Sequence, residues 1–344
     1  MDVLKALSEK SDYSAATLQL ILGAWVLGTP FEARQKICLE SGDVSEDDYD
    51  KQSIYSLLYS LYRSMGVVES DTGALYELTF NTWGYEWPES WGAPPVPEND
   101  PQRFGKHAYT GLFQFDAVKE QVREKNGRVH VVEMGCGTGA GAHHVCENVL
   151  PECTYEAVDM QLAAIRTCRR KFVPDLGGRL VATHANATSL PVKSASADFV
   201  AVCETHVTEH AGVVTREDER FFSHAHRVLR PGGHLVWGNA IPDSTWQPCF
   251  DYLESLGMKK VEERVVTREA VTARDRDDAR VKAYVKQCID RFAGFRIPVL
   301  GAKKRHEARL AMENFYRNPG TNMYRTLADG TDSYRVVCFQ KAVS

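Results

Sequence analysis

The sequence VVEMGCGTG, residues 131–139, decides the fold expected of this chain. Its first two residues are β-branched and read as the end of a buried strand, and a helix-like run begins at Ala140. Between strand and helix, Glu133 precedes Gly135, Gly137 and Gly139, and glycines let the backbone turn sharply and approach a ligand closely. Dinucleotide loops use similar glycines to hold a pyrophosphate at the start of a helix. Glu133 would repel a pyrophosphate, so the stretch predicts a cationic ligand that carries an ammonium group.

Further segments follow with the order and spacing of alternating strands and helices. Residues 155–160 predict a second strand ending in Asp159, about 20 residues past the glycines, which is the separation expected of a βαβ unit. A carboxylate at that place accepts hydrogen bonds from both hydroxyls of a ribose. Residues 180–187 predict a third strand that reaches Asn186 and Ala187, and residues 198–203 and 229–237 predict the fourth and fifth strands.

These pieces, over residues 125–241, resemble the core of the class I S-adenosylmethionine-dependent methyltransferases. The resemblance implies an α/β fold with a Rossmann-like seven-stranded sheet and S-adenosylmethionine as the cofactor. It also implies a cofactor site drawn from the ends of four strands: Glu133, Gly135, Gly137, Gly139, Asp159, Met160, Asn186, Ala187 and Glu204. The family often carries an aspartate and an alanine beside the adenine, and the amide of Asn186 is still able to serve there.

The composition is that of an ordinary globular protein with room for two domains. The chain has 344 residues, 43% of them hydrophobic and 25% charged, and a formal net charge of -5, which argues against a nucleic-acid partner. Its longest apolar run is too short to span a bilayer, and its first residues lack the basic region of a signal peptide, so we expect no membrane partner. Nine irregularly spaced cysteines favour reduced thiols and a cytoplasmic location.

Residues 1–80 predict a mainly helical, winged-helix-like domain. Apolar residues such as Leu57 and Leu61 recur at helical spacing, and two short strands flank a turn at Asp71-Thr72-Gly73. Phosphate contacts dominate DNA affinity, and this region holds 6 Lys and Arg against 13 Asp and Glu, the wrong sign for DNA. A similar module forms the dimer interface of many small-molecule methyltransferases, so the resemblance implies a homodimer.

An aromatic, proline-rich connector, residues 81–112, leads into a catalytic domain over residues 113–344. Its aromatic residues either pack across the domain junction or line the substrate pocket, and Trp83 and Tyr85 are the substrate candidates. Tyr109 is assigned to the catalytic group, since a sulfonium cation is favoured over an aromatic face.

The end of the chain predicts a sixth strand over residues 261–266 and a seventh over 333–339. Between them, residues 267–331 form an insertion with helices expected over 279–292 and 306–316. An insertion there lies above the crevice outside the carboxyl ends of the strands, so we expect a helical lid over a small-molecule methyl acceptor.

The segment ETHVTEH, residues 204–210, follows the fourth strand, where this family often places substrate-facing side chains. His206 is the candidate for a catalytic base or a substrate hydrogen bond, and His210 shares its face if the segment is helical. The two histidines could instead bind a metal or serve a structural role, but no third ligand is evident, and no metal site is assigned. Asn239, Arg305 and Tyr316 complete the substrate candidates, because an arginine can hold a carboxylate in a bidentate fork.

Two short phrases, CETH over residues 203–206 and WGNAIP over 237–242, resemble one group within the class. That group comprises the bacterial S-methyltransferases acting on 4-methylthio-2-hydroxybutyrate in dimethylsulfoniopropionate biosynthesis, which implies S-methylation. One alternative is C-methylation of an α-keto acid, with His206 and His210 holding a metal. Another is O-methylation of a phenolic natural product, with His206 as base. A DNA-binding regulator that responds to S-adenosylmethionine is a non-enzymatic alternative, which the acidic N-terminal region disfavours.

Overall fold

The computed structural model describes residues 79–205, 212–294, 309–310, 312–314 and 316–343, and two short strands before them. Contacts divide the chain into two compact units. One comprises Met1–Thr79, Gln161–Ala164 and Arg276–Met323, and the other comprises Phe80–Met160, Ile165–Asp275 and Tyr324–Ser344. In the first unit, β1 (Val68–Glu69) pairs antiparallel with β2 (Leu75–Tyr76), which confirms the predicted hairpin. The helices predicted ahead of it lie outside the described residues.

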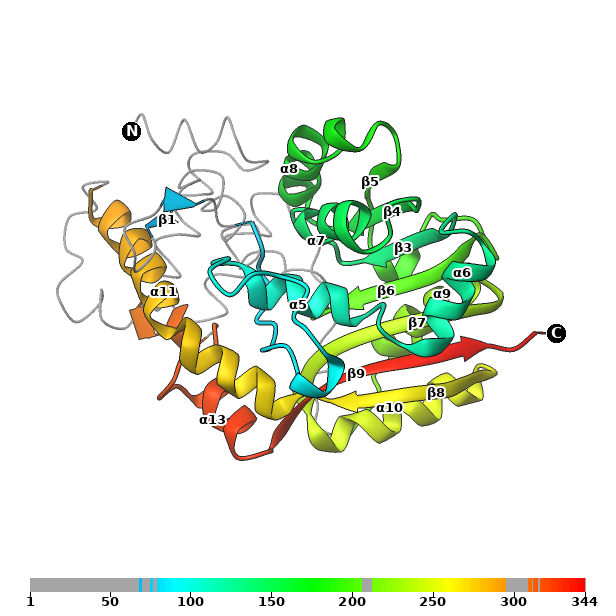
Figure 1. Ribbon diagram of the computed structural model, residues 1–344. Coiled ribbons are helices and arrows are strands. Elements are labelled where there is room, and N and C mark those ends of the chain that lie inside the picture. Colours follow the sequence, from blue (N-terminus) through cyan, green and yellow to red (C-terminus); the bar gives the residue numbers. More distant parts are fainter. Residues whose placement is uncertain are drawn as a thin grey trace, which may run out of the picture. The chain divides into compact units, whose positions relative to one another are not determined.

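The second unit is built on a seven-stranded sheet in the order β5-β4-β3-β6-β7-β9-β8 (Figure 1). The strands are β3 (His130–Met134), β4 (Thr154–Asp159), β5 (Leu180–His184), β6 (Ala197–Cys203), β7 (Leu229–Pro242), β8 (Met258–Val265) and β9 (Asp332–Lys341). Strands β3 to β7 pair in parallel, whereas β9 runs antiparallel to both β7 and β8. The predicted Rossmann-like sheet is therefore confirmed, with a strand at each of the seven predicted places.

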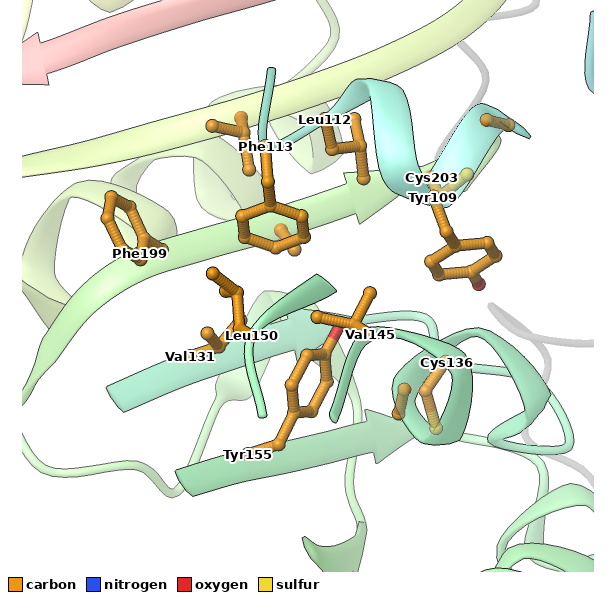
Figure 2. Close-up of a cluster of buried hydrophobic side chains, with 14 of the residues drawn as sticks. Tyr109, Leu112, Phe113, Val131, Cys136, Val145, Leu150, Tyr155, Phe199 and Cys203 are labelled. Carbon is orange, nitrogen blue, oxygen red and sulfur yellow. The ribbon is translucent and has the colours of Figure 1, made fainter. Parts of the chain in front are cut away.

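The central strands β3 and β6 are buried on both faces, which explains why they read as continuous apolar runs, whereas the edge strand β8 is partly exposed. Successive side chains of a strand point to opposite faces, so Val131 joins one hydrophobic cluster and Val132 the other. Figure 2 shows the first cluster, where Phe113 meets Phe199 of β6 edge to face with ring centroids 6.1 Å apart. On the opposite face, Trp237 of β7 is central to the second cluster.

The described helices are α5 (Arg103–Gly111), α6 (Asp116–Glu124), α7 (Ala140–His144), α8 (Leu162–Lys171), α9 (Arg216–Val228), α10 (Asp243–Ser255), α11 (Thr267–Gly294) and α13 (Asn322–Ala328). Short turns lie at η1 (Glu89–Trp91), η2 (Val145–Val149), η3 (Pro174–Leu176) and η4 (Ala187–Ser189). Side chains of α5, α6 and α7 contribute to the first cluster, and those of α9 and α10 to the second.

Helix α11 begins at Thr267, well before the helix predicted over residues 279–292. Its first turns bury Ala270 and Ala273, which face the core at i and i+3. Alanine favours helix but carries little hydrophobic contrast, so the pattern of large apolar residues missed this part.

In the part of the chain that the structure describes, none of the helices is long and apolar enough to cross a membrane. The seven cysteines that the structure describes are buried and free, as expected for reduced thiols.

Candidate active site

The glycine loop after β3 is held against the end of β4. The N–H groups of Gly135 and Cys136 both donate to the carbonyl of Val158, over 2.8 and 2.9 Å. Gly135, Gly137 and Gly139 have φ angles of 85°, 55° and 84°, which are costly for residues with a Cβ. A Cβ on Gly135 would also overlap the side chain of Thr205. The loop therefore needs glycine both for its backbone conformation and for close approach to its neighbours.

Asp159 stands at the end of β4, beside this loop. The N–H of Gly137 donates to its Oδ2 over 2.8 Å, which orients the carboxylate. Met160 follows, and its carbonyl accepts a 2.9 Å hydrogen bond from Nε2 of His184 at the end of β5. The structure thus brings the predicted ribose acid, its neighbour and the glycine loop together at the carboxyl edge of the sheet.

Asn186 caps the short turn η4, which begins at Ala187. Its Oδ1 accepts hydrogen bonds from the N–H and the hydroxyl of Thr188, both 2.9 Å long. Because these two donors fix the orientation of the amide, Nδ2 is the group that remains to meet a ligand. Asn186 therefore presents a donor at the position where an aspartate would present an acceptor.

Glu133 lies beneath the loop, with a side chain that is 0% exposed. The hydroxyl of Tyr155 donates to its Oε2 over 3.1 Å, and Tyr109 also interacts with the carboxylate. Burial raises the pKa of Glu133 to about 7, although hydrogen bonding by the two tyrosines opposes the shift. Its other carboxylate oxygen, Oε1, is buried and has no hydrogen-bond partner among the residues that the structure describes. The predicted contact of Glu133 with the cofactor stays a prediction.

Tyr109 of α5 lies directly on the start of α7. A Cβ on Gly141 would overlap the tyrosine ring, so this glycine makes room for it. Burial and the nearby Glu133 raise the pKa of Tyr109 well above its usual value, so its hydroxyl stays protonated. Figure 2 shows Tyr109 and Tyr155 in the same buried cluster, reaching it from α5 and β4.

Glu204 follows β6 and has a φ of 49°, unusual for a residue with a side chain. Its Oε2 accepts from the N–H of Trp83 over 2.6 Å, and its Oε1 from the N–H of Gly84 and the hydroxyl of Tyr334, both over 2.7 Å. Burial raises the pKa of Glu204, and these hydrogen bonds oppose the shift. Its carboxylate thus binds the connector and β9, and its predicted contact with the cofactor stays a prediction.

Two predicted substrate residues are fully enclosed. Tyr85 is 0% exposed and packs edge to face on Tyr334, with ring centroids 5.2 Å apart. Asn239 is also 0% exposed: its Nδ2 donates to the carbonyl of Thr205 over 3.2 Å, and its Oδ1 accepts from the N–H of Ala240 over 2.8 Å. Both side chains are fully buried in this structure, and their predicted contact with a substrate stays a prediction.

The other substrate candidates have different placements. Trp83 is partly exposed at the edge of the first cluster. Tyr316 belongs to the first unit, where its ring packs edge to face on Tyr284 at 5.8 Å. The structure does not describe His206, His210 or Arg305. Among the residues it does describe, no group of three His, Cys, Asp or Glu side chains could hold a metal ion.

Sequence reasoning missed several residues that shape the site. Thr205 donates its hydroxyl to the carbonyl of Gly135 over 3.0 Å and so ties the end of β6 to the glycine loop. The hydroxyl of Tyr155 donates to Glu133, and the hydroxyl of Tyr334 donates to Glu204. Only Gly141 carried a signal in the sequence, because a glycine inside a helix often marks a close approach.

Comparison with known proteins gives the class of this chain. Residues 132–237 match the family described as methyltransferase domain. The chain is 24% identical over 267 residues to phthiotriol/phenolphthiotriol dimycocerosates methyltransferase of Mycobacterium tuberculosis, a match covering 77% of this chain and 86% of that protein. It is 26% identical over 267 residues to the fatty-acid O-methyltransferase of Mycolicibacterium smegmatis, covering 77% and 84%.

Solved structures share the fold at low sequence identity. The [4+2]-cyclase SpnF superposes with a TM-score of 0.54 and 15% identity, covering 86% of this chain and 96% of its own. A StiE O-MT structure gives a TM-score of 0.50 and 17% identity, covering 76% and 87%. Because one of these is a cyclase, the fold alone does not define the reaction.

The match to the methyltransferase domain begins in β3, contains the glycine loop, Asp159 and Asn186, and ends in β7. These residues suit S-adenosylmethionine: a Cβ on Gly135 or Gly139 would overlap Thr205 or Cys168, and an oriented acid stands one strand away. The chain is an S-adenosylmethionine-dependent methyltransferase with the class I fold, and its acceptor is a small molecule.

Proposed function

We propose that this S-adenosylmethionine-dependent methyltransferase methylates a thioether sulfur, with 4-methylthio-2-hydroxybutyrate as its acceptor in dimethylsulfoniopropionate biosynthesis. The cofactor supplies a methyl group on a sulfonium, which is already a good leaving group. An acceptor sulfur lone pair forms the new S–C bond while the old S–C bond breaks, so the positive charge moves between sulfurs and no proton is released. The protein then has to bind and align the two reactants, and alignment alone can supply a large part of the rate.

The occupied carboxylate of Glu204 is the observation that carries this proposal. Glu204 lies at the carboxyl end of β6, where a general base would be useful, but it accepts three hydrogen bonds of 2.6 to 2.7 Å. Glu133, the other glutamate beside the loop, is enclosed by Tyr109 and Tyr155. Neither offers a carboxylate to an acceptor proton, which supports an acceptor such as a thioether that has no proton to lose.

Different residues would bind the cofactor, the sulfonium and the methyl acceptor. The glycine loop, Asp159 and the amide of Asn186 would bind the cofactor through its methionine, ribose and adenine parts. Trp83 and Tyr109 would provide aromatic surface beside the sulfonium, which attracts a cation. Arg305 would hold the carboxylate of the acceptor.

A second candidate function is O-methylation of a lipid acceptor. The curated relatives named above are methyltransferases of phthiotriol dimycocerosates and of fatty acids, and they match most of this chain. A lipid hydroxyl must lose a proton, so His206 would then be the base. A fatty-acid carboxylate is already ionised near neutral pH and would need no base. C-methylation of an α-keto acid would instead require a metal at His206 and His210.

The test is methyl transfer from labelled S-adenosylmethionine by the full chain to a panel of acceptors. The panel contains 4-methylthio-2-hydroxybutyrate, a long-chain fatty acid, a phenol and an α-keto acid. We expect turnover of the thioether, with a single-turnover rate that is independent of pH around 6 to 7, where histidines titrate. Chelators should leave the rate unchanged, and His206→Ala should cost about 10-fold, less than the roughly 10²–10⁴ of a lost general base.

Other results of these measurements would indicate a different methyl acceptor. A rate that rises through one ionisation and becomes flat in His206→Ala would indicate a hydroxyl acceptor such as a phenol. Turnover of the fatty acid in place of the thioether would indicate a carboxylate acceptor. Loss of turnover with a chelator, together with equal damage from His206→Ala and His210→Ala, would indicate the keto-acid reaction.

A further inference from the structure

We propose that Glu204 is a positioning residue that fixes residues 83–86, here called the strap, beside the cofactor loop, so that Trp83 forms a rigid wall for the methyl acceptor. The inference concerns methyl transfer by this chain whichever acceptor it uses. It assigns the carboxylate of Glu204 to the protein backbone, whereas the sequence suggested a contact with the cofactor.

The strap has no regular secondary structure, yet most of its backbone polar groups have distant partners in the protein. Glu204 accepts the N–H groups of Trp83 and Gly84. Arg274 of α11 donates to the carbonyl of Trp83, and Nδ1 of His107 in α5 donates to the carbonyl of Tyr85 over 3.1 Å. The N–H of Glu86 donates to the carbonyl of Glu269 over 3.0 Å.

Loops usually lie on the surface and leave such groups to water. Here side chains and backbone from three separate elements replace that water, so tertiary contacts fix the conformation of the strap. Glu204 accepts two of these five bonds and Arg274 donates a third, so a charged group takes part in three of the five, and hydrogen bonds to a charged group are the stronger ones.

The backbone conformation and the enclosed carboxylate of Glu204 both cost free energy of folding. Glu204 adopts a left-handed φ of 49°, and its carboxylate is enclosed enough to raise its pKa. Strained backbone and buried charge persist where the surrounding structure over-determines them, and they concentrate at functional sites. The cost is understandable if the position of the strap matters for function.

The position of the strap is coupled to the cofactor loop. Thr205, the next residue after Glu204, donates its hydroxyl to the carbonyl of Gly135 over 3.0 Å. On the other side of the strap, a Cβ on Gly84 would overlap the carbonyl of Phe104 in α5, the helix that carries Tyr109. Trp83 is therefore held between the end of β6 and the helix that covers the loop, and its ring is only partly buried.

Glu204→Gln tests the assignment. Both oxygens of the Glu204 carboxylate accept hydrogen bonds from the described residues. In the glutamine, the amide NH₂ replaces one of these oxygens in either orientation, so it faces at least one N–H or O–H donor and that hydrogen bond is lost. We expect faster hydrogen–deuterium exchange in the peptide covering residues 80–87, together with a KM for the acceptor raised at least about 10-fold. The calorimetric Kd for S-adenosylmethionine should stay within about 3-fold, because the cofactor loop keeps its own contacts. Glu254→Gln, on the exposed surface of α10, is the matched control and should change none of these quantities.

Two further variants keep the test decisive if Glu204→Gln fails to fold. Tyr334→Phe removes one donor but keeps the ring against Tyr85, so it should give the same changes at a smaller size. Trp83→Ala should raise the acceptor KM without loosening the strap, because its N–H remains. Unchanged exchange in both Glu204→Gln and Tyr334→Phe would overturn the proposal. A cofactor Kd that rises as much as the acceptor KM would instead assign Glu204 to direct cofactor binding.

The exchange and cofactor measurements use no acceptor. They remain informative if the thioether proves not to be the substrate, and the KM is then measured with whichever panel member turns over.

Discussion

The backbone N–H of Gly137 donates a 2.8 Å hydrogen bond to Oδ2 of Asp159, so the glycine loop itself orients the acid at the end of the neighbouring strand. The acceptor is a carboxylate, and such charge-assisted bonds are about twice as strong as neutral ones. The two motifs that the sequence shows 22 residues apart therefore act as one binding element.

Asp159→Ala and Gly137→Val should each abolish binding of S-adenosylmethionine in a protein that remains folded. The first removes the ribose acceptor and the partner of the Gly137 N–H. The second places a β-branched side chain at a φ of 55° and in the space the cofactor needs. Calorimetry should show a Kd weakened at least about 100-fold, the scale expected when a buried charged partner is lost.

Gly177→Val is the matched control for Gly137→Val. Gly177 also has a φ of 55°, but a Cβ there would meet nothing within 4 Å. It should share the backbone strain and keep cofactor affinity. Wild-type affinity in Asp159→Ala and Gly137→Val would contradict the site.

Gly141→Ala should destabilise the protein by about 1–3 kcal/mol, because the added methyl overlaps the ring of Tyr109. The double variant Gly141→Ala with Tyr109→Ala should lose clearly less stability than the two single losses added together, since removing the ring makes room for the methyl. Urea unfolding of the four proteins completes the cycle. Strict additivity would mean that the ring and the helix backbone are not in contact.

Glu133 should make the protein less stable as the pH rises from about 4.5 to about 7. Its pKa is about 7 in the folded chain against 4.5 in the unfolded one, so in this window the folded state holds the extra proton. Stability therefore falls with increasing pH, by at most about 3.5 kcal/mol at roughly 1.4 kcal/mol per pKa unit. Glu133→Gln mimics the protonated acid and should flatten this part of the stability–pH curve. An equally steep curve in the variant would assign the slope to other groups.

Asn186→Asp should weaken cofactor binding by about 10-fold without changing the melting temperature. The aspartate keeps the oxygen that caps η4 through Thr188, but replaces the Nδ2 donor by an acceptor. Calorimetry and thermal unfolding separate the two effects. Tighter binding in the variant would mean that the site wants an acceptor beside the adenine.

The full chain should be a homodimer at micromolar concentration, as the apolar stripe with Leu57 and Leu61 implies. Because Met1–Thr79 and Arg276–Met323 group in one unit, deleting the N-terminal region would remove part of that unit. Light scattering should therefore compare the intact chain with Leu57→Asp and Leu61→Asp, which should shift it toward monomer. A monomeric wild type would contradict the proposal.

The amino-acid sequence by itself determined the sheet and the cofactor loop. The central strands are runs of β-branched and apolar residues, and the loop needs glycine at left-handed φ, so both signals fit within a few neighbouring residues. The place of Asp159 beside the loop was predicted in the same way, because the length of a βαβ unit fixes its distance from the glycines.

The tertiary structure decided which of the remaining polar and aromatic residues face a ligand and which support the site. Glu204 meets Trp83 and Gly84 across a separation of about 120 residues, and no local pattern records such a pairing. Tyr85 and Asn239 are fully buried, which the sequence did not show, because burial depends on which distant segments cover a side chain. Local conformation is encoded by neighbours in the chain, whereas exposure, hydrogen-bond partners and pKa arise only when remote segments meet.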